Sequence, residues 1–355
     1  MSTIPTEIRL SLTPAGRFDV IELTRRIEND FGEVLRRYPR TLYCSFHTTA
    51  GYLGRSLAAR LHHHQDKLDL FFRGFRALFP PNAPYRHDQM HLRHELSEAQ
   101  REVEPKNGDS HLTFIGAGMS NCVTYKNAEG APVFFVDLDG VNEGRARRRE
   151  TSVLCYEREA LVERVRLAIP LSRHPIDSVN LADPKLGLLE AVDDLLKRSG
   201  LEKGRVDISL AAAERHAGLT VNEYETLLMQ HDLTEVLRDP LKYAALKGRH
   251  MLDDPLAIPG KTLNYARYDV VHVLNTLMEA FKVSESVVES LVAKVMSVPA
   301  RHLLRSRKVS FLASDPEGSG SARLVRGIYQ SPILVQWEAA ERQTRDIEIS
   351  LIRLS

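Results

Sequence analysis

The chain has 355 residues, of which 43% are hydrophobic and 27% charged, and this is the composition of a globular protein of one or two domains. Its 48 Lys and Arg nearly balance 47 Asp and Glu, so a net charge of +1 excludes a general field for binding nucleic acid. Three cysteines without a CxxC spacing argue against a disulfide framework or a cysteine zinc site and predict a cytoplasmic location.

The first half alternates strand-like and helical segments. Its N-terminus lacks a signal-peptide pattern and no apolar run approaches the length of a membrane span, so we expect no membrane partner. Alternating apolar residues predict strands at 8–13, 41–46, 121–125, 132–138 and 151–156. Helical periodicity predicts helices over 20–38 and 57–79, and the polar stretch 88–110 has the composition of a loop or a marginal helix.

The second half repeats this order of elements. Strands are predicted at 165–171, 206–213, 308–314, 323–330, 332–337 and 346–354, and helices at 186–200, 224–239 and 269–296. Ala217-Gly218 stands in the second series where Ala50-Gly51 stands in the first. The repeat predicts an α+β protein of two copies of one domain, residues 1–160 and 161–355, each with a mainly antiparallel sheet or sandwich core flanked by helices.

Three histidines of the first half come from separate segments. His47 follows a predicted strand, His87 lies in a Pro-bounded loop, and His111 follows Asn-Gly-Asp. Three neutral imidazoles that converge and leave one position open would suit zinc or a similar divalent ion, which would polarise an oxygen or activate water. The alternative is three unrelated histidines among the fourteen of the chain.

The order of these motifs resembles the YjbQ family, whose members are described as secondary thiamine-phosphate synthases. The first half carries the resemblance in FHTTAG (46–51), PYRHD (84–88), NGDSHL (107–112) and DLDGVNEGRARR (137–148), and the second in AGLTVNE (217–223), QHDL (230–233), ARHLL (300–304) and GIYQ (327–330). The resemblance implies that His47, His87 and His111 line one cleft. It also implies a homo-oligomer.

Each half departs from the family pattern in a different way. Arg55-Ser56 stands at the Asn-Glu position of the first half, whereas the second half has Asn222-Glu223 but replaces His47 by Glu214. Clustered carboxylates raise one another's pKa, so Glu223 and Asp232 are candidates for a general acid or base. Because the losses are complementary, we expect a histidine half-site to face a carboxylate half-site in one composite pocket.

The resemblance implies a phosphorylated heterocycle as substrate, as in joining a pyrimidine pyrophosphate to a thiazole phosphate. Thr48 and Thr49 offer hydroxyl hydrogen bonds and Arg147 offers a guanidinium for phosphate. The remaining predicted substrate contacts are Asn222, His302 and Gln330. The alternative is a non-catalytic protein that uses the same fold to bind a phosphorylated metabolite or a protein partner.

Overall fold

The computed structural model describes residues 4–127, 130–238, 306–315 and 320–355, so His302 and the helix predicted over 269–296 lie outside the described residues. The chain combines helices with antiparallel sheets and is an α+β protein. Its contacts divide it into two compact units. The first, here the sheet unit, comprises Met1–Ala58, Gly118–Tyr224 and Leu304–Ser355, and the second, the helical unit, comprises Ala59–Ala117 and Glu225–Leu303.

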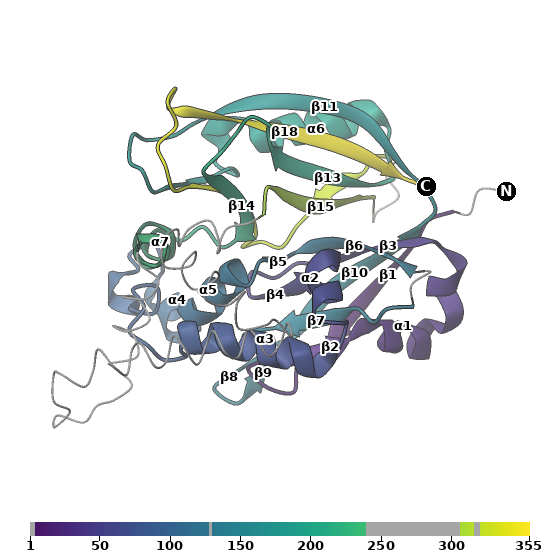
Figure 1. Cartoon of the computed structure of the whole chain (residues 1–355), viewed down its shortest axis with the longest axis horizontal. Coiled ribbons are helices and arrows are strands. Elements are labelled where there is room, and N and C mark those ends of the chain that lie inside the picture. The colour runs from purple at the N-terminus through teal and green to yellow at the C-terminus, as the bar shows by residue number, and fades with distance from the viewer. Residues whose placement is uncertain (1–3, 128–129, 239–305, 316–319) are drawn as a thin grey trace, which may run out of the picture. The chain divides into compact units, whose positions relative to one another are not determined.

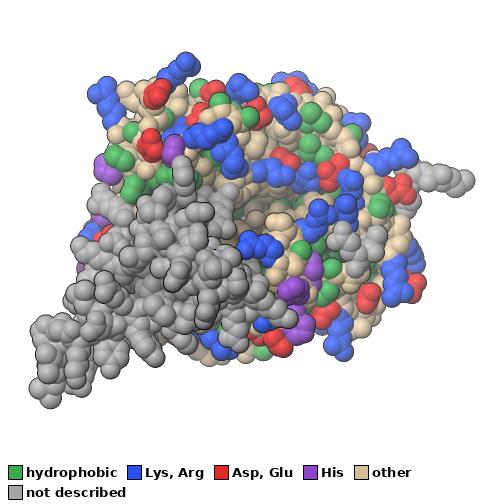
Figure 2. Space-filling view, in the orientation of Figure 1, with side chains coloured by type: hydrophobic (Ala, Val, Ile, Leu, Met, Phe, Trp, Pro, Cys, Tyr) green, Lys and Arg blue, Asp and Glu red, His purple; other side chains and the backbone are tan. Residues whose placement is uncertain are grey.

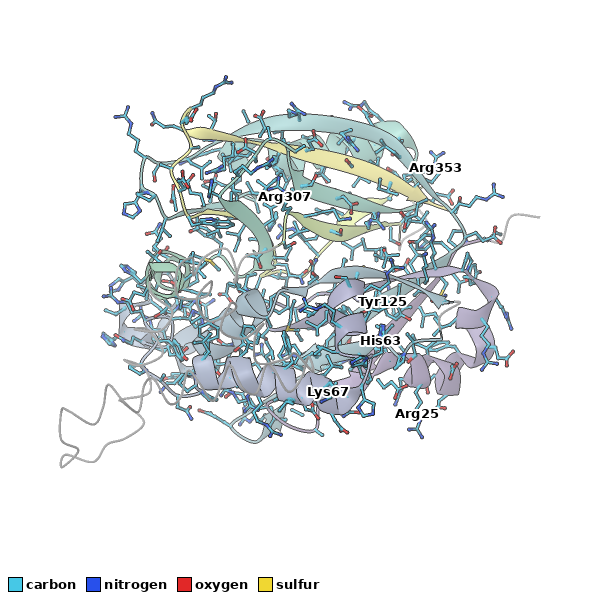
Figure 3. The ribbon with its side chains drawn as sticks, in the orientation of Figure 1. Arg25, His63, Lys67, Tyr125, Arg307 and Arg353 are labelled. Carbon is cyan, nitrogen blue, oxygen red and sulfur yellow. The ribbon has the colours of Figure 1, made fainter. Side chains whose placement is uncertain are left out.

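The first half of the chain contributes two antiparallel sheets to the sheet unit. The larger has the order β1 (Thr6–Leu12), β10 (Arg149–Tyr156), β3 (Arg40–Ser45) and β6 (Cys122–Lys126). The smaller has the order β2 (Asp19–Glu22), β7 (Phe134–Asp137), β4 (Ala50–Leu53) and β5 (Met119–Ser120). Tyr125 of β6 joins the two sheets, because its hydroxyl donates to the Leu53 carbonyl of β4 at 2.8 Å (Figure 3).

The second half contributes two further antiparallel sheets to the same unit. The larger has the order β11 (Glu159–Pro170), β18 (Thr344–Leu354), β13 (Lys203–Leu210), β15 (Lys308–Ser314) and β16 (Arg323–Val325). The smaller has the order β12 (Asp177–Asn180), β17 (Ser331–Gln336) and β14 (Ala217–Asn222). Arg307, just before β15, donates to the carbonyls of Glu214 and Ala211 at 2.9 Å each and fixes the loop that leads to β14 (Figure 3).

One amphipathic helix covers the outer face of each large sheet. Helix α6 (Leu188–Ser199) buries Leu188, Val192 and Leu195 in a core shared with β13, β15 and β18, and Figure 1 shows it against that sheet. Gly200 ends the helix in the left-handed conformation (φ 54°), which glycine adopts without steric cost. Helix α1 (Leu23–Phe31) buries Leu23 and Ile27 in the core with β1, β3 and β10.

The inner faces of the two large sheets pack on one another within the sheet unit. Their shared core joins Leu42, Cys44 and Leu154 of the first-half sheet to Leu312 and Leu354 of the second-half sheet. The chain crosses from one sheet to the other at residues 157–158, between β10 and β11. The three cysteines are free and buried.

The described residues of the helical unit form helices. They are α3 (Gln65–Leu78), η2 (Met90–Leu92), α4 (Glu98–Val103), α5 (Gly108–Gly116), η5 (Leu228–Asp232) and α7 (Leu233–Arg238). Helix α4 begins with a complete capping box between Ser97 and Gln100. No helix among the described residues is long and apolar enough to cross a membrane.

Three predicted elements differ from the structure. The single helix predicted over 57–79 is wrong, because His62 and His63 adopt positive φ values of 55° and 49° and separate α2 (Arg55–Arg60) from α3. The helix predicted over 20–38 is instead β2, α1 and the 3-10 helix η1 (Gly32–Arg37). The strand predicted over 323–330 ends at Val325 and continues as a turn.

Candidate functional site

The predicted site residues that the structure describes fall in both units, and each unit is described separately. His47, Thr48, Thr49, Arg147, Asn222, Glu223 and Gln330 belong to the sheet unit, whereas His87, His111 and Asp232 belong to the helical unit.

In the sheet unit, His47 lies in the loop that follows β3. Its Nε2 accepts a hydrogen bond from the backbone N–H of Glu150 at 2.8 Å, so the proton of the neutral ring is assigned to Nδ1. Burial, with the nearby Arg149 and Arg147 guanidinium groups, lowers the pKa of His47 to about 3. His47 is therefore a neutral, partly exposed hydrogen-bond donor near neutral pH.

A buried ion pair stabilises the loop that carries His47. Arg149, the first residue of β10, donates through Nε and Nη2 to the carboxylate of Asp137 at 2.6 and 2.8 Å, and both side chains are buried. Arg149 also donates to the Asp139 carbonyl at 2.7 Å. The hydroxyl of Thr49 lies 3.5 Å from Arg149 and is buried, so Thr49 belongs to this support. Arg149 is thus bound on several sides by the protein.

Arg147 lies nearer the surface. Its guanidinium forms an ion pair with the buried carboxylate of Asp139 while the side chain stays partly exposed. Its charge contributes to lowering the pKa of His47, so the two side chains are close enough to interact electrostatically. We call His47, Thr48 and Arg147 together the β3 cluster.

Two residues of the second half hold the β3 cluster in place. The Gln330 side-chain amide donates to the carbonyls of Ser45 and His47 at 3.0 and 2.9 Å. Asn222, at the end of β14, donates to the Thr48 carbonyl at 3.2 Å. Side chains of the second half thus contact the loop that carries His47, whereas the pocket of facing histidine and carboxylate half-sites stays a prediction.

The turn at 327–330 approaches the β3 loop closely. A Cβ atom at Gly327 would lie 1.9 Å from the Phe46 carbonyl oxygen, so only glycine fits there. Although the turn is fixed by Gln330, its two central side chains project from the protein, with Ile328 91% and Tyr329 68% exposed. An ordered turn thus presents an exposed apolar pair immediately beside the residues that hold His47.

In the helical unit, His87 is fully buried and bonded through both ring nitrogens. Nδ1 lies 3.2 Å from Glu225 and Nε2 lies 3.1 Å from Asn107. The His111 ring packs edge-on against that of His87 with the ring centroids 5.0 Å apart. The structure therefore brings His87 and His111 together, as the sequence predicts, within a buried polar cluster.

Two carboxylates complete this cluster. Asp232 accepts the backbone N–H groups of Arg86 and His87 at 3.1 and 3.0 Å and so positions the loop that carries His87. Glu225 accepts the N–H groups of Leu227 and Leu228 at 2.7 Å each. Burial alone would raise the pKa of Glu225, but the hydrogen bonds from His87 and these two N–H groups lower it overall.

The predicted zinc ligands do not fit a metal ion in this arrangement. Both ring nitrogens of His87 are already engaged, and Nε2 of His47 accepts a backbone N–H. In the part of the chain that the structure describes, no three His, Cys, Asp or Glu side chains form a group that would hold a metal ion. No step proposed below passes through a metal.

Sequence reasoning missed two partners in these clusters. It selected Glu223, whereas the carboxylate on His87 comes from Glu225, two residues further along. The position of Glu225 just before a helix is the available signal, since acidic side chains cap helix N-termini. It also did not single out Asp137, whose buried carboxylate pairs with Arg149.

Comparison with known proteins gives distant structural matches only. No protein-family model and no curated protein matches the sequence. A YbjQ-like protein of unknown function from Sulfolobus solfataricus matches with 16% identity and a TM-score of 0.28, over 55% of this chain and 99% of that chain. A hypothetical protein from Aeropyrum pernix matches with 12% identity and a TM-score of 0.27, over 53% and 96%. An uncharacterised YjbQ-family protein from Clostridium acetobutylicum matches with 11% identity and a TM-score of 0.25, over 54% and 99%.

Proposed function

We propose that the chain binds a phosphorylated small molecule at the β3 cluster. The observation that carries this proposal is the neutral, partly exposed imidazole of His47 beside the guanidinium groups of Arg147 and Arg149. Burial is the largest cause of the low pKa of His47, and the two guanidinium charges lower it further. The same two charges would attract an anion, so a phosphate group would meet guanidinium and neutral donors on one ordered loop.

Each side chain of the cluster has a distinct part in this binding. His47 offers its Nδ1 proton, because Nε2 is held by the Glu150 N–H. Arg147 offers a fork of N–H donors that suits phosphate oxygens, and Thr48 offers a hydroxyl. The exposed side chains of Ile328 and Tyr329 supply a surface on which the ring of a phosphorylated heterocycle packs.

The test is calorimetric titration with inorganic phosphate and with pyrophosphate. We expect His47→Ala and Arg147→Gln each to weaken binding at least about tenfold, since the first removes a neutral donor and the second removes a charge-assisted donor to the anion. Arg342→Gln, an exposed arginine of the second half, is the matched control and should leave binding unchanged. Equal affinity in the wild type and both β3-cluster variants would refute the site.

We propose the transferase reaction implied by the sequence resemblance as the first activity to assay. A thiazole nitrogen attacks the methylene of a pyrimidine pyrophosphate, a C–N bond forms, the C–O bond breaks and pyrophosphate leaves. A histidine with a pKa of about 3 is a poor general base near neutral pH, so His47 is assigned to binding. Pyrophosphate release that requires both substrates supports the reaction, whereas binding without release supports the non-catalytic alternative.

We also propose that residues 1–160 and 161–355 are divergent copies of one domain. The support is that the larger sheets share an order in which the last strand of each half lies beside its first strand. The smaller sheets share a register: Asp137 pairs with Ala50 in the first half, and Gln336 pairs with Ala217 in the second.

Matched hydrogen bonds at the start of each smaller sheet add to this support. The Asp19 carboxylate accepts the N–H groups of Ala15 and Val20 at 2.7 and 2.8 Å. The Asp177 carboxylate accepts those of Ser172 and Ser178 at 2.9 and 2.8 Å. Asp19 pairs with Asp137 in the first half, and Asp177 pairs with Gln336 in the second.

A further inference from the structure

Two of the three cysteines face each other on neighbouring strands of the larger first-half sheet. Cys44 of β3 pairs directly with Cys122 of β6, and their sulfur atoms lie 2.7 Å apart. The next pair along is hydrogen-bonded, since the Ser45 N–H donates to the Asn121 carbonyl at 2.7 Å. Cys44 and Cys122 therefore form a non-hydrogen-bonded pair, in which opposed side chains lie closest. The Cα atoms of such a pair are about 4.5 Å apart, a separation that a disulfide can span.

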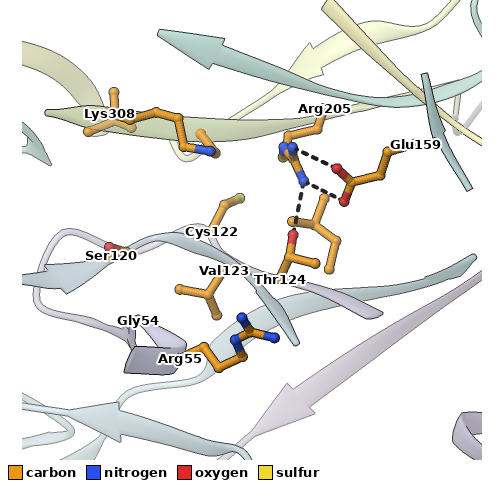
Figure 4. A pocket seen from close by; sticks show the side chains of 12 residues that line it. Gly54, Arg55, Ser120, Cys122, Val123, Thr124, Glu159, Arg205 and Lys308 are labelled. Carbon is orange, nitrogen blue, oxygen red and sulfur yellow. Dashed lines mark hydrogen bonds and ion pairs between the residues drawn. The ribbon is translucent and has the colours of Figure 1, made fainter. Parts of the chain in front are cut away.

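One of these two thiols reaches a cavity between the two large sheets of the sheet unit. The cavity has a volume of about 310 Å³, and Cys122 is one of its lining residues. Figure 4 shows the Cys122 side chain directed into the cavity from β6, and Figure 2 shows the hollow on this face of the molecule. Cys122 is 8% exposed, whereas Cys44 is 0% exposed. A small oxidant that enters the cavity therefore meets Cys122 before Cys44.

The surroundings of the Cys44 thiol oppose its ionisation. Burial, the adjacent Cys122 thiol and the Glu7 carboxylate raise the pKa of Cys44 well above its usual range, against the opposite effect of the Arg205 guanidinium. The thiolate is the form of cysteine that peroxides oxidise. Cys44 is therefore suited to the second step of a two-step oxidation, in which a thiol condenses with an oxidised neighbour, and Cys122 is placed for the first step.

We propose that Cys44 and Cys122 form a reversible disulfide when hydrogen peroxide enters this cavity. In the first step, the Cys122 thiolate attacks one peroxide oxygen, the O–O bond breaks, and a sulfenic acid forms. The released hydroxide takes up the proton that the Cys122 thiol lost and becomes water. In the second step, the Cys44 sulfur attacks the sulfenic sulfur, an S–S bond forms, the S–O bond breaks, and the hydroxide leaves with the Cys44 proton as water. The two thiols lose two electrons, which reduce one peroxide to two waters.

Cys155 provides an internal reference for this reaction. It belongs to the core that also holds Tyr43 and Val153, whereas Cys44 and Cys122 belong to the core between the two large sheets. Cys155 is 0% exposed, and its sulfur accepts a hydrogen bond from the Thr41 hydroxyl at 3.6 Å. Oxidation of the facing pair while Cys155 remains a thiol is therefore the result that distinguishes the proposed reaction from general oxidation of the protein.

The experiment treats the whole chain with hydrogen peroxide, blocks the remaining thiols with iodoacetamide in urea, and maps the peptides by mass spectrometry without reduction. We expect a peptide that links Cys44 to Cys122, and loss of these two thiols at least about tenfold faster than loss of the Cys155 thiol. Dithiothreitol should restore both thiols, because a disulfide is reducible and a sulfinic acid is not. Cys155→Ala is the matched control and should form the same link at the wild-type rate.

Single variants separate the roles of the two thiols. In Cys44→Ala, the oxidised Cys122 has lost its partner, so we expect a sulfenic acid that dimedone traps and, at higher peroxide concentration, an irreversible sulfinic acid. In Cys122→Ala, the buried Cys44 should be oxidised at least about tenfold more slowly than in the wild type. Circular dichroism before treatment checks that each variant is folded, and the wild-type link tests the proposal without any substitution.

The outcomes decide the proposal. It is overturned if no peptide links Cys44 to Cys122 by the time half of the Cys155 thiol has been oxidised. Oxidation of Cys44 at the wild-type rate in Cys122→Ala overturns the assignment of Cys122 as the thiol that reacts first. Phosphate binding does not enter this measurement, so the disulfide and the proposed anion site at the β3 cluster are tested independently.

Discussion

If the two halves are divergent copies, as proposed above, His47 and Glu214 occupy the same loop position and use it in opposite ways. In the first half, Nε2 of His47 accepts the N–H of Glu150 at 2.8 Å. In the second half, Oε1 of Glu214 accepts the N–H of Asp346, also at 2.8 Å. The backbone contact is retained while the side chain changes from a neutral imidazole to a carboxylate.

The buried arginine beside this position is compensated differently in each half. Arg149 pairs with Asp137 on the neighbouring strand. Arg345 lies on the equivalent strand of the second half, where the neighbouring residue is Gln336, and its ionic partner is Glu214 at 2.9 Å. Each arginine has one carboxylate, supplied from the strand in one half and from the loop in the other.

The different placement of the carboxylate bears directly on the proposed anion site. With its carboxylate on the strand, the first half leaves the loop position to His47, an uncharged donor. With its carboxylate in the loop, the second half places a negative charge at that position, which would repel phosphate. Under the proposal, only the first half therefore binds an anion at this position.

The largest expected effect comes from giving the first half the strand residue of the second. Asp137→Gln leaves the buried guanidinium of Arg149 without its carboxylate, and we expect a loss of about 3–5 kcal/mol in the free energy of unfolding. Urea denaturation with a two-state fit measures this. A loss below about 1 kcal/mol would show that the ion pair does not hold the loop.

The double variant Asp137→Gln with His47→Glu completes the exchange. It recreates the set found around Arg345, so we expect it to recover at least half of the lost stability. The introduced carboxylate should repel phosphate at the β3 cluster and abolish its binding there. If the loss in the free energy of unfolding of the double variant equals the sum of the losses of Asp137→Gln and His47→Glu, the positions of His47 and Glu214 are not equivalent.

The reciprocal change in the second half has a smaller effect. Glu214→Gln removes the ionic partner of Arg345, but the guanidinium keeps its contacts to the carbonyls of Arg215 and Glu338 at 2.5 and 2.7 Å. We expect a loss of about 2–3 kcal/mol, because a buried charge loses its counter-charge and retains part of its hydrogen bonding. Glu341→Gln is the exposed control. Phosphate affinity should not change, and a change would show that the second half takes part in binding.

Gln330→Ala tests how the second half supports the first. The variant leaves the carbonyls of Ser45 and His47 without the donor that reaches them at 3.0 and 2.9 Å, and we expect a loss of about 2 kcal/mol. Phosphate binding should weaken as the loop loosens. Gln343→Ala, at an exposed position of the second half, is the control. Unaltered phosphate binding in a folded Gln330→Ala protein would show that the turn at 327–330 is not needed for binding at the β3 cluster.

Local patterns in the sequence were enough to predict most strands and the α+β class. Apolar patterning placed β1, β3, β10, β15 and β18 within a few residues. β1 and β18 alternate between buried and more exposed positions, whereas β3, β10 and β15 are buried along nearly their whole length. Hydrophobic periodicity did not predict the break in the helix expected over 57–79. The break depends on left-handed backbone conformations at His62 and His63, which periodicity does not encode.

The partners within the site depend on long-range register and could not be read from spacing. Asp137 meets Arg149 because β7 pairs with β4 while β10 pairs with β3, so two sheets must form before the contact exists. Glu225 reaches His87 across 138 positions of the chain. The strand registers of the folded chain, rather than the order of the motifs, therefore decide which side chains meet.

The smallest expected effect is the pH dependence of stability that His47 imposes on the first half alone. The pKa of His47 in the folded chain, about 3, lies below the value of 6.5 for an unperturbed histidine. Between these two pH values, His47 is protonated in the unfolded chain and neutral in the folded chain. Stability should therefore fall as pH falls through this window. For one such group the change between pH 7.5 and 5.5 is about 1 kcal/mol.

His47→Gln isolates this contribution, because the amide cannot titrate and its oxygen can still accept the Glu150 N–H. Urea denaturation at both pH values should show a smaller difference in the variant than in the wild type. His174→Gln, an exposed histidine of the second half, should leave the difference unchanged. Equal pH dependence in the wild type and His47→Gln would mean that His47 can be protonated in the folded protein. In that case His47, like Glu214 in the second half, would carry a charge in the folded protein. The two halves would then differ at this position only in the sign of that charge.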